Sequence, residues 1–261
     1  MNFALLVDLA RARWRFVVGL SVSLVGLSVL YLGMYPTLRE QLEVFARGLP
    51  DAIRALIGDA DLGTPEGYLC SEVFAITAPF LVAALAITIG VSLARSERDR
   101  TLISMFAAPL SRRTLALTHL TWTLVVALAG ATVVLVTTVV GADLAGMGVS
   151  VAAIAAATLH LAAFSSAMGA VAFAGAAATG SPAVGLATGW GVTVAAFVTD
   201  SVSHLVDSAA WLADVSPWGW YGGGVALSEG VDPLGVGLLL TLTALAASFG
   251  IIAYGRRDLA F

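Results

Sequence analysis

Residues 73–94 read VFAITAPFLVAALAITIGVSLA, and residues 95–113, which follow directly, read RSERDRTLISMFAAPLSRR. The first stretch contains no Asp, Glu, Lys or Arg, and it is as long as the roughly 20 residues that an α-helix needs to cross the hydrocarbon core of a bilayer. The second stretch carries five arginines. This pairing predicts a membrane-spanning helix followed by a loop that stays in water.

The composition of the whole chain supports the same class of fold. Of 261 residues, 59% are hydrophobic and only 11% are charged, whereas a soluble domain carries about 25% charged residues. A soluble globule of this size could not bury so much apolar surface. We therefore expect an all-α integral membrane protein whose residues 1–261 form one transmembrane domain.

Stretches free of charged residues predict six transmembrane helices. A run from about 144 to 199 is too long for one helix, and Thr179-Gly180-Ser181-Pro182 is expected to break it. The predicted spans are 16–35, 72–94, 114–141, 150–178, 184–206 and 233–255.

The arginines predict the orientation of these helices, because cytoplasmic loops are enriched in Lys and Arg. Ten of the 13 basic residues fall on one side of a six-span arrangement, in residues 1–15, in the loop 95–113 and in the tail 256–261. That side is expected to be the cytoplasm, with both termini in it. The segments 36–71 and 207–232 are then external.

Several segments outside the spans also have recognisable patterns. Residues 1–15 carry apolar side chains at helical spacing and predict an amphipathic helix on the inner membrane surface. Residues 36–71 predict short external helices, one of them beginning at Pro50. In 207–232, Trp218, Trp220 and Tyr221 are of the type that anchors at the membrane interface; direct contact with a substrate is the alternative.

The cytoplasmic loop 95–113 is the most informative of these segments. Ser96 and the acids that follow it resemble a helix cap, and Leu102, Met105 and Phe106 would form an apolar ridge on a short helix that Pro109 ends. Such a ridge can dock into a groove on a partner protein. The pattern alone leaves open whether the ridge binds a partner or lies on lipid.

The sequence also argues against several kinds of chemistry. All 13 basic residues are Arg, and a P-loop needs a Lys to reach the terminal phosphates of a nucleotide. Within the charge-free runs on which these spans are based, the histidines are His119 and His160, and each is expected to be a packing residue with a hydrogen-bonded ring. Cys70 has no partner for an internal disulfide. We therefore expect no catalytic residue, metal or cofactor in this chain, and no binding of nucleic acid.

Small residues in two predicted spans favour close helix packing. Residues 152–178 are rich in Ala, Gly and Ser, and Gly185 and Gly189 form a G-x-x-x-G pair. Packing within the chain and a subunit interface both account for this pattern, and Gly185 and Gly189 are the candidate residues for the interface.

The loop 95–113 resembles the loop after the second span of type-2 ABC transporter permeases. That pattern is an acidic cluster, Gly-Thr-Leu, a few apolar residues and then Pro-hydrophobic-Ser-Arg. The matching residues are Glu97, Thr101, Leu102, Pro109, Ser111 and Arg112, while Arg100 replaces the usual Gly. Further similarities to drug exporters of this family lie in 56–68, in Ser216-Pro217-Trp218, and in Arg257-Asp258-Leu259.

The resemblance implies a permease subunit of an ABC exporter in a prokaryotic plasma membrane. Two six-span subunits, either two copies or this chain and a related one, would pair along spans one and five, and each would sit on a separate ATP-binding subunit that holds ATP and magnesium. The loop would be the coupling helix, with contacts at Glu97, Thr101, Leu102, Met105, Phe106, Pro109, Arg112 and Arg113. The cargo would be an amphipathic or hydrophobic small molecule, lipid or peptide. A non-transport membrane protein, such as an immunity or sensor component, and an ion-coupled carrier are the alternatives.

Overall fold

The structure, a computed structural model, describes residues 3–46, 63–98 and 111–257, and within these ranges it contains helices and turns but no β-strand. By length and apolar composition, six helical segments in these ranges could cross a membrane, which is the number predicted from the sequence. They are Arg13–Leu38, Pro65–Arg98, Arg112–Leu144, Val151–Thr179, Pro182–Leu205 and Pro233–Arg256.

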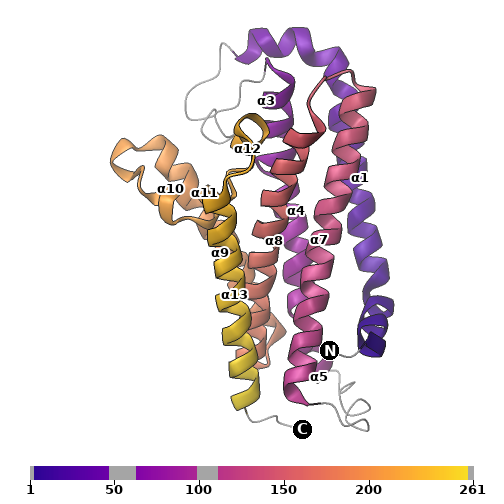
Figure 1. Cartoon of the computed structure of the whole chain (residues 1–261), viewed down its shortest axis with the longest axis vertical. Helices are drawn as coiled ribbons and strands as arrows, with labels where there is room; N and C mark the ends of the chain where they lie inside the picture. The colour runs from indigo at the N-terminus through magenta and orange to yellow at the C-terminus, as the bar shows by residue number, and fades with distance from the viewer. Residues whose placement is uncertain (1–2, 47–62, 99–110, 258–261) are drawn as a thin grey trace.

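Helix α8 (Val151–Thr179) lies at the centre of the bundle and contacts helices on several sides (Figure 1). Of its most apolar stretch, 67% is buried, against 22% for each of α9 and α13. Ala, Gly and Ser side chains let neighbouring backbones approach closely, so the small-residue composition of α8 explains its central place. The helices around it are α4 (Thr77–Gly90), α7 (Arg112–Leu144), α9 (Pro182–Leu205) and α13 (Pro233–Arg256).

Two glycines allow α4 and α8 to pack closely within this bundle. A Cβ atom on Gly90 of α4 would lie 2.5 Å from the carbonyl oxygen of Gly169 in α8. A Cβ on Gly169 would lie 2.8 Å from the Thr123 Cγ2 atom of α7 and 3.0 Å from the Ala86 Cβ atom of α4. A larger residue at Gly90 would therefore separate α4 from α8, and one at Gly169 would push α8 away from both α4 and α7.

Helix α1 (Phe3–Ala46) is continuous, whereas the sequence predicted an interfacial helix over 1–15, a span over 16–35 and external helices beyond. The stretch around the predicted boundary, residues 10–18, contains no Gly or Pro that would end a helix, so the helix continues into the span. Pro36 lies inside α1 and removes one hydrogen bond of its ladder; α1 changes direction toward its C-terminal end (Figure 1). The helix packs mainly on α7 and leaves a long apolar face exposed.

The second span is interrupted, whereas the sequence predicted one helix over 72–94. It consists of α3 (Pro65–Leu69), a π-helical turn η1 (Cys70–Phe74), α4 and α5 (Ser92–Arg98). Breaks of this kind leave backbone groups that need other partners.

The break predicted at residues 179–182 is present in the structure. Helix α8 ends at Gly180, whose φ of 71° is the left-handed conformation that glycine adopts without strain. Helix α9 begins at Pro182, and the Ser181 hydroxyl accepts a hydrogen bond from the backbone N–H of Val184. The polypeptide therefore reverses between two antiparallel helices in very few residues.

Between α9 and α13 the chain forms a compact segment of short helices that projects from the side of the bundle (Figure 1). The helices are η2 (Asp207–Ala209), α10 (Leu212–Val215), α11 (Pro217–Tyr221) and α12 (Val225–Glu229). Helix α11 packs on α8, α9 and α13.

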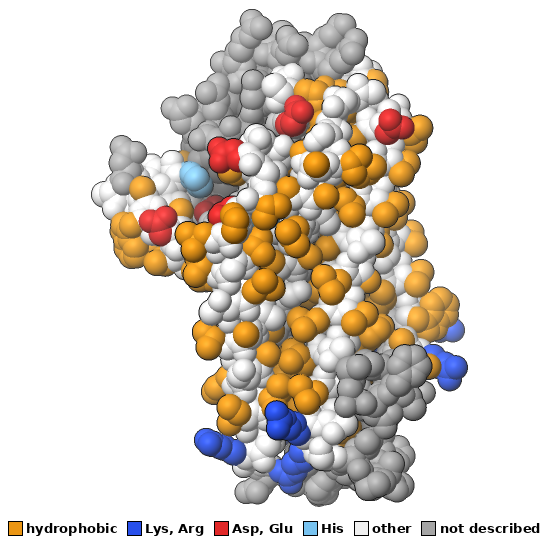
Figure 2. All heavy atoms as spheres, viewed as in Figure 1, with side chains coloured by type: hydrophobic (Ala, Val, Ile, Leu, Met, Phe, Trp, Pro, Cys, Tyr) orange, Lys and Arg blue, Asp and Glu red, His pale blue; other side chains and the backbone are white. Residues whose placement is uncertain are grey.

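Charged side chains separate to the two ends of the bundle (Figure 2). The arginines whose side chains the structure describes gather at the start of α1, the end of α5, the start of α7 and the end of α13, which we call the arginine-rich end. Of the acidic side chains that the structure describes, Glu97 alone lies there. The others define the acidic end and are Glu66, Glu72, Asp143, Asp200, Asp214, Glu229 and Asp232.

Candidate functional site

The arginine-rich end contains an ion pair between residues that lie 160 positions apart in the sequence. Arg257, directly after α13, donates from Nη2 to the Oε2 atom of Glu97 in α5. The side chains are 18% and 16% exposed. A pair so little exposed is screened less by water and salt than a surface pair.

Arg257 also binds the end of the central helix. Its Nη1 atom donates to the carbonyl oxygen of Ala177 at 3.0 Å. The last carbonyls of a helix have no partner within the helix, and cations are favourable there because of the helix dipole. A Cβ on Gly180 would lie 2.7 Å from the same Nη1 atom, so the guanidinium occupies the space that this glycine leaves.

Arg112, the first residue of α7, completes the arrangement. Its Nη1 atom donates to the backbone carbonyl of Arg257 at 2.8 Å. We refer to Glu97, Arg112, the Ala177 carbonyl and Arg257 as the Arg257 cluster. The cluster joins the ends of α5, α8 and α13 to the start of α7, and thus connects four of the six apolar segments at one point.

The Arg257 cluster lies where the chain enters and leaves the loop 95–113. Glu97 is in α5, one residue before the described range ends, and Arg112 begins α7 on the other side. Ser96 lies inside α5, so it does not cap a new helix as its sequence suggested. Thr101, Leu102, Met105, Phe106 and Pro109 lie outside the described residues.

Arg113 does not belong to the Arg257 cluster. It is exposed and lines a groove of about 510 Å³ between α7 and α13, together with Arg256 and an apolar face of α13. The predicted residues Glu97, Arg112 and Arg113 are therefore divided between two neighbouring features. Sequence reasoning missed Arg257 as the partner of Glu97, although its position in the Arg-Asp-Leu ending was a signal.

The pair Gly185 and Gly189 packs inside the chain. A Cβ on Gly185 would lie 2.6 Å from the Ala176 Cβ atom, and one on Gly189 would lie 2.9 Å from the Ala172 Cβ atom, both in α8. Both glycines are buried. Packing within the chain, one of the two alternatives left open by the sequence, therefore accounts for both glycines, and their role at a subunit interface stays a prediction.

A cluster of aromatic side chains packs near the acidic end. Trp218 of α11 contacts Phe80 and Phe164, with ring centroids 5.0 and 5.2 Å apart, and Phe197 at 4.9 Å. Trp218 is 6% exposed and Tyr221 is 1% exposed. These two rings pack in the protein core and are not the interfacial anchors that the sequence suggested, because α11 folds back onto α8 and α9.

Two hydrogen bonds of His160 fix the segment that carries these rings. The backbone N–H of Asp232 donates to Nε2 of His160 at 3.0 Å, so Nδ1 carries the proton and donates to the Tyr221 carbonyl at 2.8 Å. The ring is therefore fully hydrogen-bonded, as the sequence analysis expected. His119 is also buried, and its Nδ1 atom lies 2.9 Å from the Ser92 hydroxyl.

Tyr221 connects the same segment to the π-helical turn. Its hydroxyl donates to the carbonyl of Phe74 at 2.8 Å. Burial, with a smaller contribution from Cys70, raises the pKa of this hydroxyl well above its usual value, so it remains a donor. The Tyr221 hydroxyl therefore provides a hydrogen-bond partner for a backbone carbonyl in the turn that interrupts the second span.

No group of three or more His, Cys, Asp or Glu side chains in the described ranges could hold a metal ion. The contacts described above connect four apolar segments at the arginine-rich end and pack aromatic rings together near the acidic end.

Comparison with known proteins identifies the family. Residues 3–255 match the family described as "Multidrug efflux system permease Rv1217c, C-terminal domain". A comparison with curated proteins finds no match. A match over nearly all of the chain, together with six apolar helices, supports a transport role in a membrane. The chain thus belongs to the family of the C-terminal domain of the multidrug efflux system permease Rv1217c.

Proposed function

We propose that the chain is the permease subunit of an ABC exporter of the type-2 class. It would move an amphipathic or hydrophobic small molecule, lipid or peptide out of a prokaryotic cell. A separate ATP-binding subunit would bind ATP and magnesium and hydrolyse the nucleotide. This chain would contribute the path and the coupling helix, and no catalytic residue.

The Arg257 cluster is the observation that carries this proposal. A coupling element must pass a displacement of the cytoplasmic loop to the helices that line the path. Glu97 and Arg112, at the two roots of that loop, are joined through Arg257 to α8 and α13. A displacement of either root would therefore act on four apolar segments, and the central helix α8 is among them.

Charge distribution supports the proposed orientation. The arginines whose side chains are described gather at the end that carries the loop, and Arg-rich ends face the cytoplasm in membrane proteins (Figure 2). In this orientation the loop would meet an ATP-binding subunit in the cytoplasm, and α11 would face outward. A second subunit, either the same chain or a related one, would pack on the exposed apolar faces of α1 and α9.

Substitutions on the predicted apolar ridge test the proposal. Leu102→Asp or Phe106→Asp should abolish ATP-dependent uptake of substrate into inverted membrane vesicles while membrane insertion stays normal, because a carboxylate cannot enter an apolar groove without a large desolvation cost. Ser104→Asp is the matched control. In the predicted helix Ser104 lies on the face away from the ridge, and this variant should export normally.

The outcomes separate the proposal from its alternatives. Normal export by both ridge variants contradicts the coupling assignment. Export that persists without ATP but stops when the ion gradient is collapsed indicates an ion-coupled carrier. Failure to co-purify with any ATP-binding subunit, with no export of any tested compound, indicates a non-transport membrane protein.

A further inference from the structure

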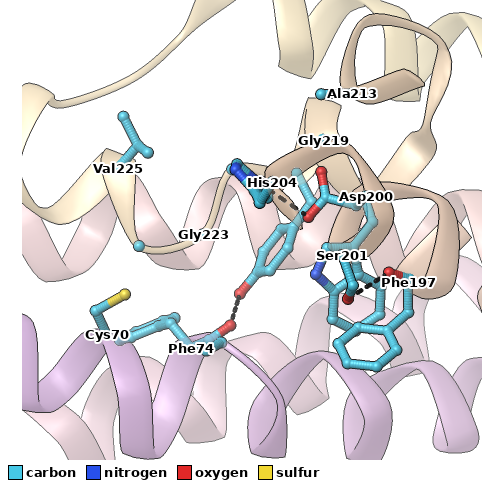
Figure 3. A pocket seen from close by; sticks show the side chains of 15 residues that line it. Cys70, Phe74, Phe197, Asp200, Ser201, His204, Ala213, Gly219, Gly223 and Val225 are labelled. Carbon is cyan, nitrogen blue, oxygen red and sulfur yellow. Dashed lines mark hydrogen bonds and ion pairs between the residues drawn. The ribbon is translucent and has the colours of Figure 1, made fainter. Parts of the chain in front are cut away.

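A cavity of about 360 Å³ lies at the acidic end, between α9, the π-helical turn η1 and the segment that follows α10. Its volume falls in the range of pockets that bind drug-sized molecules. Figure 3 shows Asp200, Ser201 and His204 of α9 on one side and Cys70 and Phe74 on another. We call it the Asp200 cavity.

Asp200 is the acidic group that the described residues place in this cavity. It lies five positions before the end of α9, within an apolar segment long enough to cross a membrane. An ionisable side chain in such a segment is costly and usually has a function. Its side chain is 16% exposed, and the nearest cationic candidate is His204, with Nε2 3.7 Å from Oδ2.

His204 does not neutralise the carboxylate of Asp200 in the way that an arginine would. A distance of 3.7 Å exceeds that of a charge-assisted hydrogen bond, and a neutral imidazole carries no charge to offset the acid. No arginine lines the Asp200 cavity among the described residues. The ionised carboxylate therefore leaves one negative charge facing a partly enclosed space.

The position of the carboxylate is fixed by its neighbours. A Cβ on Gly219 would lie 3.1 Å from the Asp200 Oδ1 atom and 2.3 Å from the Ala213 carbonyl oxygen. The backbone of α11 thus passes directly against the carboxylate because residue 219 is a glycine. A fixed charge attracts a ligand without first losing the entropy of a free side chain.

Aromatic rings supply the second component of the cavity wall. Phe197, Trp218 and Tyr221 line it, and all three belong to the aromatic cluster near the acidic end. The faces of aromatic rings attract cations, most strongly when water is excluded. A carboxylate beside aromatic rings is thus suited to a ligand that combines positive charge with apolar groups.

The surrounding charge favours the same ligand. The acids whose side chains are described, other than Glu97, lie at the acidic end, and the arginines whose side chains are described lie at the opposite end (Figure 2). Clustered charge of one sign raises the local concentration of ligands of the other sign and repels ligands of its own sign. Organic anions should therefore bind poorly in the Asp200 cavity.

We infer that the Asp200 cavity binds lipophilic organic cations, with Asp200 facing the positive charge and the rings of Phe197 and Trp218 facing the apolar groups. This rests on the proposed function, because it gives the exporter a binding site for a substrate class on the outward side of the bundle. Export of cations would end in this site before release.

Binding to the purified full-length chain, without any ATP-binding subunit, tests this inference separately from transport. Tetraphenylphosphonium and tetraphenylborate have nearly the same size and apolar surface but opposite charge. Calorimetric titration in detergent at slightly alkaline pH should show saturable binding of the phosphonium and none of the borate. Asp200→Asn should weaken phosphonium binding by about tenfold or more.

Two further variants keep the test interpretable. Asp200→Glu retains the charge and should bind the phosphonium within a few-fold of the wild type. Asp214→Asn removes an exposed acid of α10 that does not line the Asp200 cavity, and should bind like the wild type.

Equal binding of both ions, or unchanged phosphonium binding in a folded Asp200→Asn variant, overturns the inference. A loss of binding in both Asp200 variants also overturns it, since the charge would then not be the determinant. None of these results bears on ATP-dependent export, which the ridge variants test.

Discussion

Replacing Arg257 with glutamine should uncouple the four helix ends that meet in the Arg257 cluster. The change removes the ion pair with Glu97 and weakens the bond to the Ala177 carbonyl, while it keeps a polar side chain of similar length. Hydrogen bonds to charged groups contribute about 1.5–3 kcal/mol each. Because the Glu97 side chain is only 16% exposed, water cannot fully replace its lost partner.

We expect the local opening equilibrium at this end to shift by about 2 kcal/mol, which is roughly thirtyfold. Amide hydrogen exchange at the ends of α5 and α13 measures that shift. The ion pair itself is isolated by a double-mutant cycle of Arg257→Gln and Glu97→Gln, whose coupling energy should be about 1–3 kcal/mol. Both single variants should also lower ATP-dependent export more than they lower insertion.

The control is Arg256→Gln, which removes a neighbouring exposed arginine outside the Arg257 cluster. Its exchange rates should change by less than about threefold, since surface substitutions are typically within 0.5 kcal/mol. Effects of Arg257→Gln and Glu97→Gln that simply add would refute the reasoning, because groups that do not interact show no coupling. So would an Arg256→Gln effect as large as that of Arg257→Gln.

Two further predictions concern packing and the external segment. Gly189→Leu should destabilise the purified chain by about 1–3 kcal/mol through overpacking against α8. The control is Gly191→Leu, two residues along α9, which has nothing within 4 Å of its Cβ position and should leave the melting temperature unchanged. Equal effects of the two substitutions would contradict the packing described here. Tyr221→Phe should remove the hydrogen bond to the Phe74 carbonyl and lower the stability of the π-helical turn by about 1–3 kcal/mol. Faster amide hydrogen exchange in the turn measures this loss. Unchanged exchange would show that the bond does not stabilise the turn.

Several features could be predicted from the sequence because they depend on local composition. Uncharged stretches of sufficient length predicted six spans, and the part of the chain that the structure describes contains six helical segments of that kind. The Thr-Gly-Ser-Pro break was predicted and is present, because Gly180 and Pro182 act on their own backbone. Arginine placement predicted one basic end, and the arginines whose side chains are described gather at one end.

Other features could not be predicted because they depend on contacts between distant segments. The π-helical turn in the second span has no local sequence signal, and its Phe74 carbonyl is bonded by Tyr221, 147 residues away. The G-x-x-x-G pair of α9 indicated close packing, but not against which helix. The helical spacing of apolar residues in 1–15 predicted a helix there. It did not predict that this helix, α1, continues through residue 46.

The sequence by itself determined the class of fold, the number of apolar helices and the separation of charge, because the cost of placing charge and unpaired backbone in lipid acts on each segment separately. Only the tertiary structure decided that Glu97 pairs with Arg257, that Trp218 is buried and that Asp200 faces a cavity. Each of these depends on which helices become neighbours, and that follows from the packing of small residues around α8.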